Sequence, residues 1–483
     1  MQTLARKRLA WQEMSARQTM NNYLTATDPL ALAAEFPIGH AFVERFRAIS
    51  RDALRAEQEA RFQRVLAFAW KTPFYRRLWG DRGIEPGDIT GLDDLAKLPT
   101  FDKSDIMDSI ARHPPFGDFH GMETYALRDR PPVILHTTSG TTGKPQVLLF
   151  GPRGREVQNL LLARAYLLQG LRDDDIVHSV YGHGMVNGGH YIREVFTHWT
   201  RAIFMPAGTG IETRSQTQVE MMRDFGSTVI VGFGDYIKHL GQVAREAGLE
   251  CGRDLKIRMI SGHVGEDRDA VRDAWGGAEV FDWYGVGDTG IIAGEGPDHA
   301  GLYVMEDAQY LELLDIESAK PVADDEIGDM VVTVLFKDDI YPMIRFNTHD
   351  VTAFRTDTSP LGLNLRRIRG FLGRSDNMVK LRGINVFPQA IAAILAERRD
   401  FAGEYVCKVR RDGSGRETMT VAIEVNAAEA SSTEYRELLR RRLGVEVEVE
   451  FAVPGALAAV TGIESRQKPI RLVDERGRVN GEK

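Results

Sequence analysis

The chain contains 483 residues, of which 43% are hydrophobic and 27% charged, a composition typical of folded globular proteins. A single hydrophobic core usually stops growing near roughly 250 to 300 residues, so this length predicts at least two domains. The formal net charge of −8 provides no broad positive surface, which argues against a nucleic-acid partner.

The two cysteines, Cys251 and Cys407, lie far apart and form no CxxC pair. They predict neither a disulfide framework nor a zinc knuckle. The N-terminal residues mix charges with apolar positions and lack the continuous apolar stretch of a secretory signal, and no apolar run approaches transmembrane length. We therefore expect a cytoplasmic protein that does not bind membranes.

The first predicted element is a helix from Asp52 to Trp70, where apolar residues recur at helical spacing before Pro73. From Pro131 to Tyr284 short apolar runs alternate with helical patterns. Strands are predicted at VILH, QVLLF, DIVHSVY, AIFMPAG, STVIVGF, LKIRMISG and EVFDWYG, and helices near 156–169, 217–224 and 236–247. This alternation predicts an α/β fold around a mainly parallel sheet.

After Gly301 the strand-rich segments LYVMED, QYLELLD and DMVVTVL predict a β subdomain. The order of elements changes again near Gly373. Helices are predicted at 389–399 and 433–443, among the strand-like runs EYVCKV, MTVAIEV and VEVEVEF. We therefore expect a small C-terminal α+β domain of about one hundred residues.

A loop of hydroxyl and glycine residues follows the strand VILH. It comprises Thr137, Thr138, Ser139, Gly140, Thr141, Thr142, Gly143 and Lys144. Its backbone amides, hydroxyls and ammonium group suit a polyphosphate. It is not a Walker A motif, because positions 138 and 145 hold Thr and Pro. The alternative is a surface turn, in which the same residue types are common.

The segment TTSGTTGKP resembles the phosphate loop of the adenylate-forming superfamily, which includes acyl-CoA synthetases, luciferases and peptide-synthetase adenylation domains. YGHGMVNGGH (181–190), YPMIRFNTHDVT (341–352) and GRSDNMVKLRGINVFPQAI (373–391) are similar to its phenylacetate-CoA ligase branch. The resemblance extends from about Phe62 to the C-terminus. It implies that Mg·ATP and an acid give an acyl-adenylate and pyrophosphate, after which a nucleophile displaces AMP.

The resemblance implies roles for four residues near or within the small domain. Asp350 would hold the ribose hydroxyls, which a carboxylate can accept, and Arg374 would reach the nucleotide. Asp376 would be the hinge, which divides the chain into a large domain (1–372), a linker (373–376) and a mobile domain (377–483). Lys468 would swing into the adenylation site to stabilise developing negative charge. A turn-forming Asp, surface ion pairs and a solvated lysine are the alternatives.

Two segments depart from the family pattern. The tyrosine-glycine motif, Tyr284 and Gly285, usually ends in a glutamate that ligates Mg²⁺, but here it ends in Asp288, whose side chain is shorter. The resemblance implies that Tyr284 stacks on adenine. Gly262 and His263 stand where relatives usually have a Gly-Ala-Glu segment against the adenine. Gly262 still permits close backbone approach, whereas His263 either faces the pocket or caps a strand.

The closest-looking branch implies an aromatic or arylacetic acid as substrate. We expect its pocket to comprise Tyr181, His183, Gly184, Gly188, Phe233 and Tyr236, although these residues also suit ordinary sheet packing. No zinc is expected, because IIAGEGPDHAGLYVMED contains no cysteine. Relatives in this branch are commonly dimers, so the resemblance implies a homodimer.

Coenzyme A is the expected acceptor. The departures at Asp288 and His263 leave open a non-CoA acceptor or an atypical substrate, as in an amide synthetase or a nitrite-activating, ATP-dependent diazotase. An alternative of another class is a non-catalytic nucleotide-binding module, which loss of the loop, Asp350 or Lys468 would favour. All three features are present.

Overall fold

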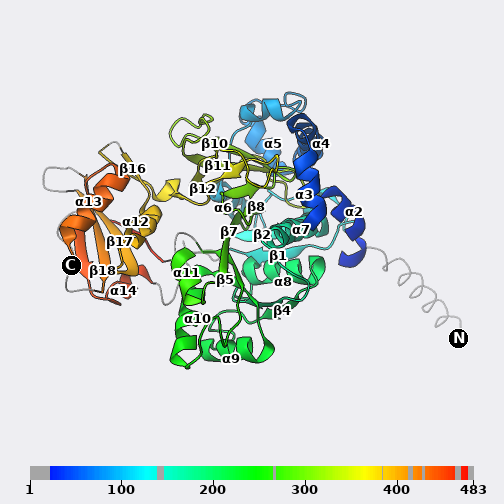
Figure 1. Ribbon diagram of the computed structural model, residues 1–483. Coiled ribbons are helices and arrows are strands. Elements are labelled where there is room, and N and C mark those ends of the chain that lie inside the picture. The colour runs from blue at the N-terminus through cyan, green and yellow to red at the C-terminus, as the bar shows by residue number, and fades with distance from the viewer. Residues whose placement is uncertain are drawn as a thin grey trace, which may run out of the picture.

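The computed structural model describes residues 22–138, 146–264, 268–382, 384–411, 417–426, 430–462 and 469–476. They form a large α/β body and, to one side of it, a smaller domain built from the C-terminal elements (Figure 1). The predicted α/β fold class is confirmed. Within these residues no helix combines the length and apolar character needed to cross a membrane.

An eight-stranded sheet forms the centre of the large body, with strand order β13-β9-β8-β7-β6-β5-β3-β4. The strands from β4 to β7 in this order are parallel, and those from β7 to β13 are antiparallel. Their bounds are β3 (Ile176–Ser179), β4 (Ile203–Pro206), β5 (Val229–Phe233), β6 (Met259–His263), β7 (Glu279–Val286), β8 (Gly290–Glu295), β9 (Leu302–Val304) and β13 (Arg367–Ile368).

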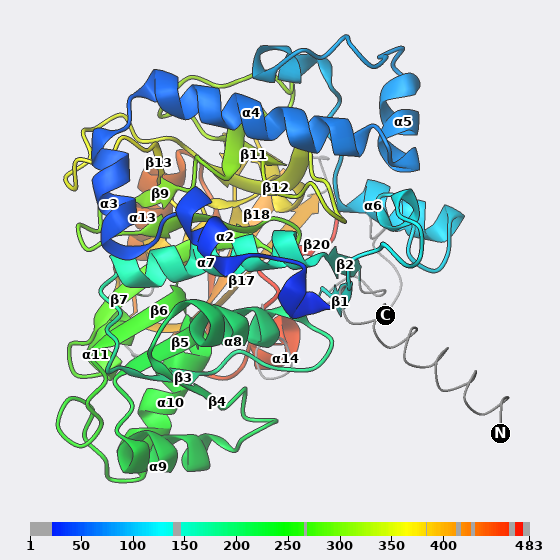
Figure 2. The same cartoon turned by 90° about the vertical axis from the view of Figure 1, so that its right-hand side faces the viewer.

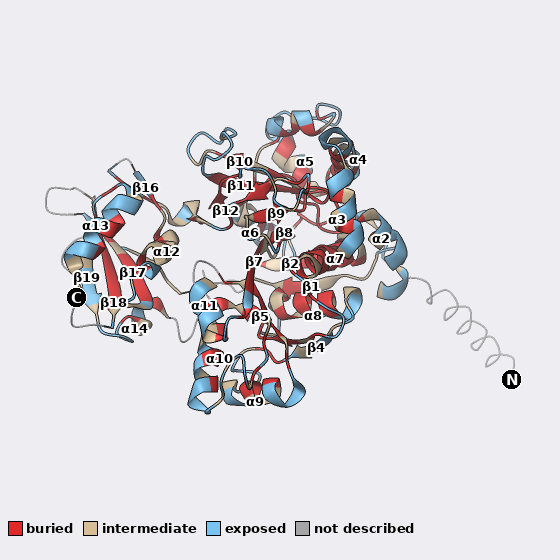
Figure 3. Ribbon diagram, in the orientation of Figure 1, coloured by how far each residue is buried: buried red, intermediate tan, exposed pale blue. Residues whose placement is uncertain are grey.

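Helices cover both faces of this sheet. The helices are α7 (Pro152–Leu168), α8 (Asn187–Trp199), α9 (Ser215–Phe225), α10 (Gly234–Glu246) and α11 (Arg268–Ala274). α7 and α8 pack with Val177 and Val231 in one buried cluster, and α9 to α11 pack with Ile230 and Ile260 in another. The buried strands between these helices are visible in Figure 3. Helices predicted near 156–169, 217–224 and 236–247 are confirmed, whereas the apolar pattern does not predict α8.

One expected feature of the parallel sheet is wrong. The runs VILH and QVLLF form β1 (Ile134–Thr137) and β2 (Val147–Phe150), which pair with each other as a separate antiparallel sheet of two strands. A parallel pairing needs a crossover of a dozen or more residues, and the connection between these strands is too short for one.

The β subdomain is a four-stranded antiparallel sheet in the order β10-β11-β12-β14. Its strands are β10 (Gln309–Leu314), β11 (Gly328–Val334), β12 (Phe346–Thr352) and β14 (Gly373–Arg374). In the described residues, five α-helices precede β1: α2 (Pro29–Glu35), α3 (Gly39–Ala48), α4 (Arg51–Ala69), α5 (Pro73–Gly80) and α6 (Lys103–Arg112). α4 is the predicted first helix, and Figure 2 shows it running above α7.

The C-terminal elements have a core of their own. Tyr405, Cys407, Val421, Tyr435 and Leu439 are buried together in it. The four-stranded sheet has the order β19-β18-β17-β20, and a two-stranded sheet pairs β15 with β16. The elements are β15 (Val379–Leu381), β16 (Ile384–Val386), α12 (Ile391–Ala396), β17 (Phe401–Arg411), β18 (Glu417–Val425), α13 (Ser432–Leu443), β19 (Glu448–Ala452), α14 (Ala458–Thr461) and β20 (Leu472–Asp474).

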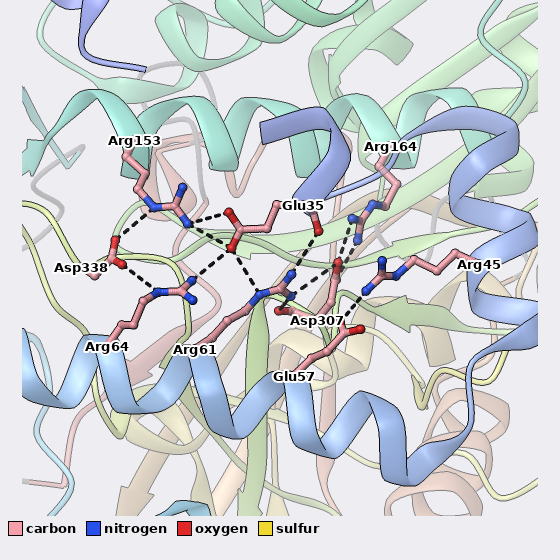
Figure 4. Close-up of polar contacts among 9 residues, drawn as sticks. All are labelled: Glu35, Arg45, Glu57, Arg61, Arg64, Arg153, Arg164, Asp307 and Asp338. Carbon is pink, nitrogen blue, oxygen red and sulfur yellow. Dashed lines mark hydrogen bonds and ion pairs between the residues drawn. The ribbon is translucent and has the colours of Figure 1, made fainter. Parts of the chain in front are cut away.

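An ion-pair network with a buried centre at Asp307 joins α2, α4 and α7 to the β subdomain (Figure 4). The Arg164 guanidinium donates to both Asp307 carboxylate oxygens, at 2.8 and 2.9 Å, and both side chains are fully buried. Arg61 of α4 donates to the Asp307 carbonyl, and its guanidinium lies 4.0 Å from the Asp307 carboxylate. Glu35 at the end of α2 accepts from Arg153 at 2.9 Å. Asp307 therefore neutralises two cations from different helices.

We predict that Asp307→Ala lowers the free energy of unfolding of the large domain by about 3–5 kcal/mol, because it leaves Arg164 buried without its carboxylate. Urea denaturation followed by tryptophan fluorescence measures this, since all six tryptophans precede residue 373. The control is Asp129→Ala, which removes an exposed pair with Arg128. It should change the free energy by less than about 1 kcal/mol. Equal effects of the two substitutions would contradict the prediction.

Candidate active site

Hydrogen bonds close the base of the predicted phosphate loop. The amide of Thr137, the last residue of β1, donates to the Met185 carbonyl at 2.7 Å. The Thr138 amide donates to the Gln146 carbonyl at 3.0 Å, and the Gln146 amide donates back to Thr138 Oγ1 at 3.2 Å. The other predicted loop residues lie outside the described residues: Ser139, Gly140, Thr141, Thr142, Gly143 and Lys144. The predicted catalytic residue, Lys468, also lies outside them.

Asp288, the predicted magnesium ligand, lies at this loop base, in the turn between β7 and β8. Its carboxylate Oδ1 accepts from Gln146 Nε2 at 2.6 Å and from the Tyr341 hydroxyl at 2.8 Å. Lys337 Nζ donates to its backbone carbonyl. Burial raises the pKa of Asp288 and lowers that of Lys337 to about 8. The sequence interpretation missed both residues as partners of Asp288, although Gln146 directly follows TTSGTTGKP and Tyr341 begins YPMIRFNTHDVT.

Asp350, the predicted ribose ligand, is 6% exposed and lies in β12 directly opposite Arg374 in β14. Arg374 Nη1 donates to Asp350 Oδ1 at 3.0 Å. The Tyr284 hydroxyl donates to Asp350 Oδ2 at 2.6 Å. Burial and the Asp350 charge raise the pKa of Tyr284, so its hydroxyl stays protonated and donates. Three residues predicted to touch the nucleotide are thus brought into one hydrogen-bonded cluster.

The same arginine reaches the predicted hinge residue. Arg374 Nε and Nη2 donate to the two carboxylate oxygens of Asp376, at 2.8 and 2.6 Å. Burial alone would lower the pKa of Arg374, but its hydrogen bonds to Asp376 and the charge of Asp350 outweigh this effect and raise that pKa. Arg374 therefore stays charged and links the two carboxylates.

Close backbone contacts require glycine at two predicted adenine-site positions. Gly262 in β6 pairs with Gly232 in β5, and a Cβ at 262 would lie 1.9 Å from the Gly232 carbonyl oxygen. A Cβ at Gly285 would lie 2.4 Å from the Gly290 carbonyl oxygen, where β7 and β8 shift register. The described contacts of these glycines are with neighbouring strands.

Four aromatic rings form a row near the carboxyl ends of the parallel strands. Tyr181 lies edge-on to Phe233, with ring centroids 5.2 Å apart. Phe233 stacks on His263 at 5.3 Å, and His263 lies 4.4 Å from Trp283. His263 both ends β6 and joins this row, so the geometry is compatible with either predicted role. Ligands of α/β sheets commonly bind at this edge.

The structure separates Tyr236 from that row. Its hydroxyl lies 3.0 Å from Ser215 Oγ and accepts from Gln218 Nε2 at 3.1 Å. Tyr236 packs on the cluster between α9, α10 and the sheet, whereas Tyr181 and Phe233 pack on the cluster that includes α7 and α8. Tyr236 lies in the helix that begins at Gly234, and its predicted place in the acid pocket stays a prediction.

Three histidines contact one another beside the loop base. His190 stacks on His136 at 4.8 Å and lies edge-on to His183 at 5.5 Å. Burial lowers the pKa of His136 to about 4 and also lowers that of His183. Gly184 turns its loop with φ +114° and its carbonyl lies 2.8 Å from His190 Nε2. A Cβ at Gly188 would lie 3.7 Å from the Tyr181 ring.

No group of three or more His, Cys, Asp or Glu side chains in the described part of the chain has an arrangement suited to a metal ion. The described histidine contacts are ring contacts, one stacked and one edge-on. The sequence interpretation missed His136, because it lies 54 residues from His190 and carries no local spacing signal.

Comparisons with known proteins place these features in context. Residues 383–476 match the family model described as AMP-binding enzyme C-terminal domain. Phenylacetate-coenzyme A ligase from Pseudomonas putida is 30% identical over 401 residues, which cover 80% of this chain and 85% of that enzyme. Phenylacetate-coenzyme A ligase from Aromatoleum evansii is 28% identical over 458 residues, or 90% of this chain and 97% of the relative.

Solved structures of 2-hydroxyisobutyryl-CoA ligase are similar to this chain over most of its length. In the postadenylation state with R3-HIB-AMP, that enzyme matches with a TM-score of 0.75 and 25% identity, covering 90% of this chain and 92% of its own. In the thioesterification state with 2-HIB-AMP and CoA, the TM-score is 0.63 at 27% identity, with the same coverage.

We predict that Gly262→Ala lowers the free energy of unfolding by about 1–3 kcal/mol or more, because the added methyl group overlaps the β5 backbone. Gly80→Ala is the control, since a Cβ there meets no atom within 4 Å. Chemical denaturation of both variants measures the difference. An unchanged stability of Gly262→Ala would show that the close strand contact does not constrain this position.

Proposed function

The chain belongs to the AMP-forming acid–CoA ligases of the adenylate-forming superfamily, and on this premise we propose that it activates an aromatic or arylacetic acid with ATP and transfers the acyl group to coenzyme A. The observation that carries the proposal is the buried cluster of Asp350, Tyr284 and Arg374. Its carboxylate and two oriented donors are suited to a ribose and its adjoining groups.

In the nucleotide site, Asp350 accepts hydrogen bonds from the ribose hydroxyls and Arg374 reaches the nucleotide from β14. The hydrogen bond to Asp350 fixes the hydroxyl end of Tyr284, and its ring stacks on adenine. Gly262, His263 and Gly285 border the base. The loop from Thr137 to Lys144 cradles the phosphates with its backbone amides and hydroxyls.

Asp288 would hold Mg²⁺. The fit rests on the buried carboxylate beside Gln146, where the phosphate loop returns to β2. Burial raises the pKa of Asp288, and a divalent cation would favour the ionised form that the burial disfavours. Mg²⁺ bound there would neutralise phosphate charge. Tyr341 and Gln146 orient the carboxylate through their hydrogen bonds to Oδ1.

The acid pocket comprises the aromatic row and the loop above it. Tyr181 and Phe233 provide flat apolar surface, and Gly184 and Gly188 leave space for a ring. His183 lies at the same loop, and burial lowers its pKa, which favours a neutral imidazole. These features support an aromatic ring over a charged or highly polar chain.

A domain rotation would separate the two half-reactions. We place the large domain at 1–372, the linker at 373–376 with its hinge at Asp376, and the small domain at 377–483. The separate buried cores support this division, and the higher TM-score to the postadenylation state supports an arrangement suited to the first half-reaction. Rotation then carries Lys468 away and admits the acceptor.

The reaction breaks and forms two bonds in sequence. In the first step an oxygen of the substrate carboxylate attacks the α-phosphorus and the bond to pyrophosphate breaks. Lys468 stabilises the negative charge that develops there. In the second step the coenzyme A thiolate attacks the acyl carbon and AMP leaves with the bonding electrons.

The acceptor is tested by incubating the enzyme with Mg·ATP and a panel of arylacetic, benzoic and aliphatic acids, with and without coenzyme A. We predict acid-dependent pyrophosphate release for aryl acids and sustained turnover with acyl-CoA formation only when coenzyme A is present. Parallel reactions contain an amine or nitrite instead of coenzyme A. Turnover with those compounds and none with coenzyme A would overturn the assigned acceptor, and an absence of acid-dependent pyrophosphate release would overturn adenylation.

We predict that Lys468→Ala slows pyrophosphate release by roughly a hundredfold or more, by analogy with removal of one transition-state donor. Lys320→Ala, an exposed lysine in the β subdomain, is the control and should retain the wild-type rate. Acyl-CoA formation from separately prepared acyl-adenylate should be much less affected by Lys468→Ala. An unchanged pyrophosphate-release rate refutes the role of Lys468.

A further inference from the structure

His349 immediately precedes Asp350 and has an unusual backbone conformation. Its φ is +57°, in the left-handed region that few residues other than glycine adopt, although Asn, Asp and His are found there more often than other side chains. Its amide donates to Asn347 Oδ1 at 2.8 Å, which supports the tight bend. A strained residue beside a ligand-binding carboxylate calls for a compensating interaction.

The imidazole supplies that interaction by reaching a different element. His349 Nε2 lies 2.7 Å from the carboxylate of Asp102, the residue that caps α6. Asp102 in turn accepts hydrogen bonds from the Ser104 amide and hydroxyl, at 2.7 and 2.6 Å. The carboxylate is therefore fixed by the helix terminus, and it fixes the ring.

The other side of His349 faces the linker turn. Nδ1 lies 3.4 Å from the Ser375 hydroxyl, and that hydroxyl donates to the His349 carbonyl at 3.3 Å. Ser375 stands between Arg374 and Asp376, so His349 touches the turn at the point where Arg374 bridges the two carboxylates. One residue thus connects α6, β12 and the linker.

Three carboxylates face the imidazole: Asp102 from the α6 terminus, Asp329 from β11 at 3.8 Å and Asp376 from the linker. The hydrogen bond to Asp102 raises the pKa of His349 and outweighs the opposing effect of burial. Protonation therefore provides a second N–H on the side of Ser375 and Asp329. When the His349 ring loses that proton, the three carboxylates lose the positive charge beside them.

We infer that His349 is a positioning residue, which braces the linker turn against α6 and thereby holds Asp350 and Arg374 in the arrangement that binds the nucleotide. The inference rests on the proposed ribose role of Asp350. Because the pKa of His349 is raised, its ring stays protonated to a higher pH than an ordinary histidine. The contacts that hold the linker turn against α6 are therefore present at low pH and are lost as pH rises through that pKa.

The test measures the affinity for adenosine by calorimetry from pH 5.5 to 9, because the charge of this probe is constant over that range. Wild-type affinity should fall as pH rises through the His349 pKa. In His349→Asn, affinity at low pH should fall about tenfold or more and no longer vary with pH. Asn tolerates the left-handed backbone, which limits the change to the ring. Asp102→Asn should move the wild-type transition to lower pH.

His40→Asn is the matched control, since His40 is exposed and pairs only with Glu44 one helical turn away in the contacts described. It should leave the wild-type pH profile unchanged. An NMR titration of the His349 ring in wild type and Asp102→Asn gives a second measurement on folded protein, and a lower pKa in Asp102→Asn is expected. Superimposable profiles for wild type and His349→Asn, or a ring pKa insensitive to Asp102, would overturn the inference.

Asp350→Ala separates this inference from the proposed function. If Asp350→Ala removes adenosine binding while the His349→Asn profile matches wild type, the ribose site stands and the bracing role fails. If Asp350→Ala binds adenosine like wild type, the ribose assignment itself fails.

Discussion

The ion pairs of Arg374 with Asp350 and Asp376 connect the nucleotide site of the large domain to the linker. They depend on a short strand pairing, in which β14 places Arg374 directly opposite Asp350. A cation shared by two carboxylates keeps its charge, and each carboxylate constrains the position of the other. The hydrogen bond from Tyr284 then orients the remaining oxygen of Asp350. The contacts with Asp350 therefore fix the position of Arg374 at the start of the linker.

The ion pairs of Asp307 also connect separate parts of the chain through one shared charged group. Asp307 accepts Arg164 and lies near Arg61, so one carboxylate from the chain segment before β10 fixes helices from two parts of the sequence. Removing one member of such a buried group costs far more than losing a surface pair, because the remaining charge cannot be hydrated.

Much of this arrangement could be predicted from the sequence. Alternating apolar runs predicted the parallel sheet, α7, α9 and α10, and the family motifs indicated residues that meet at Asp350. The pattern did not predict α8, whose first turn contains two glycines, residues that favour loops. It placed β1 and β2 in the wrong sheet, and it gave no sign that Tyr236 packs on a different apolar cluster from Tyr181 and Phe233. The contacts of Arg164 with Asp307 and of His136 with His190 join residues far apart, and such pairs have no local periodicity to reveal them.

The central claim is that Asp350 binds the ribose hydroxyls, and it is tested most directly by comparing adenosine with 2′,3′-dideoxyadenosine in wild type and Asp350→Ala. Calorimetry gives the four affinities of a cycle. Wild type is expected to bind adenosine more tightly than the dideoxy compound by about tenfold or more, and Asp350→Ala is expected to bind both nucleosides equally. The same preference for adenosine in both proteins would contradict the claim.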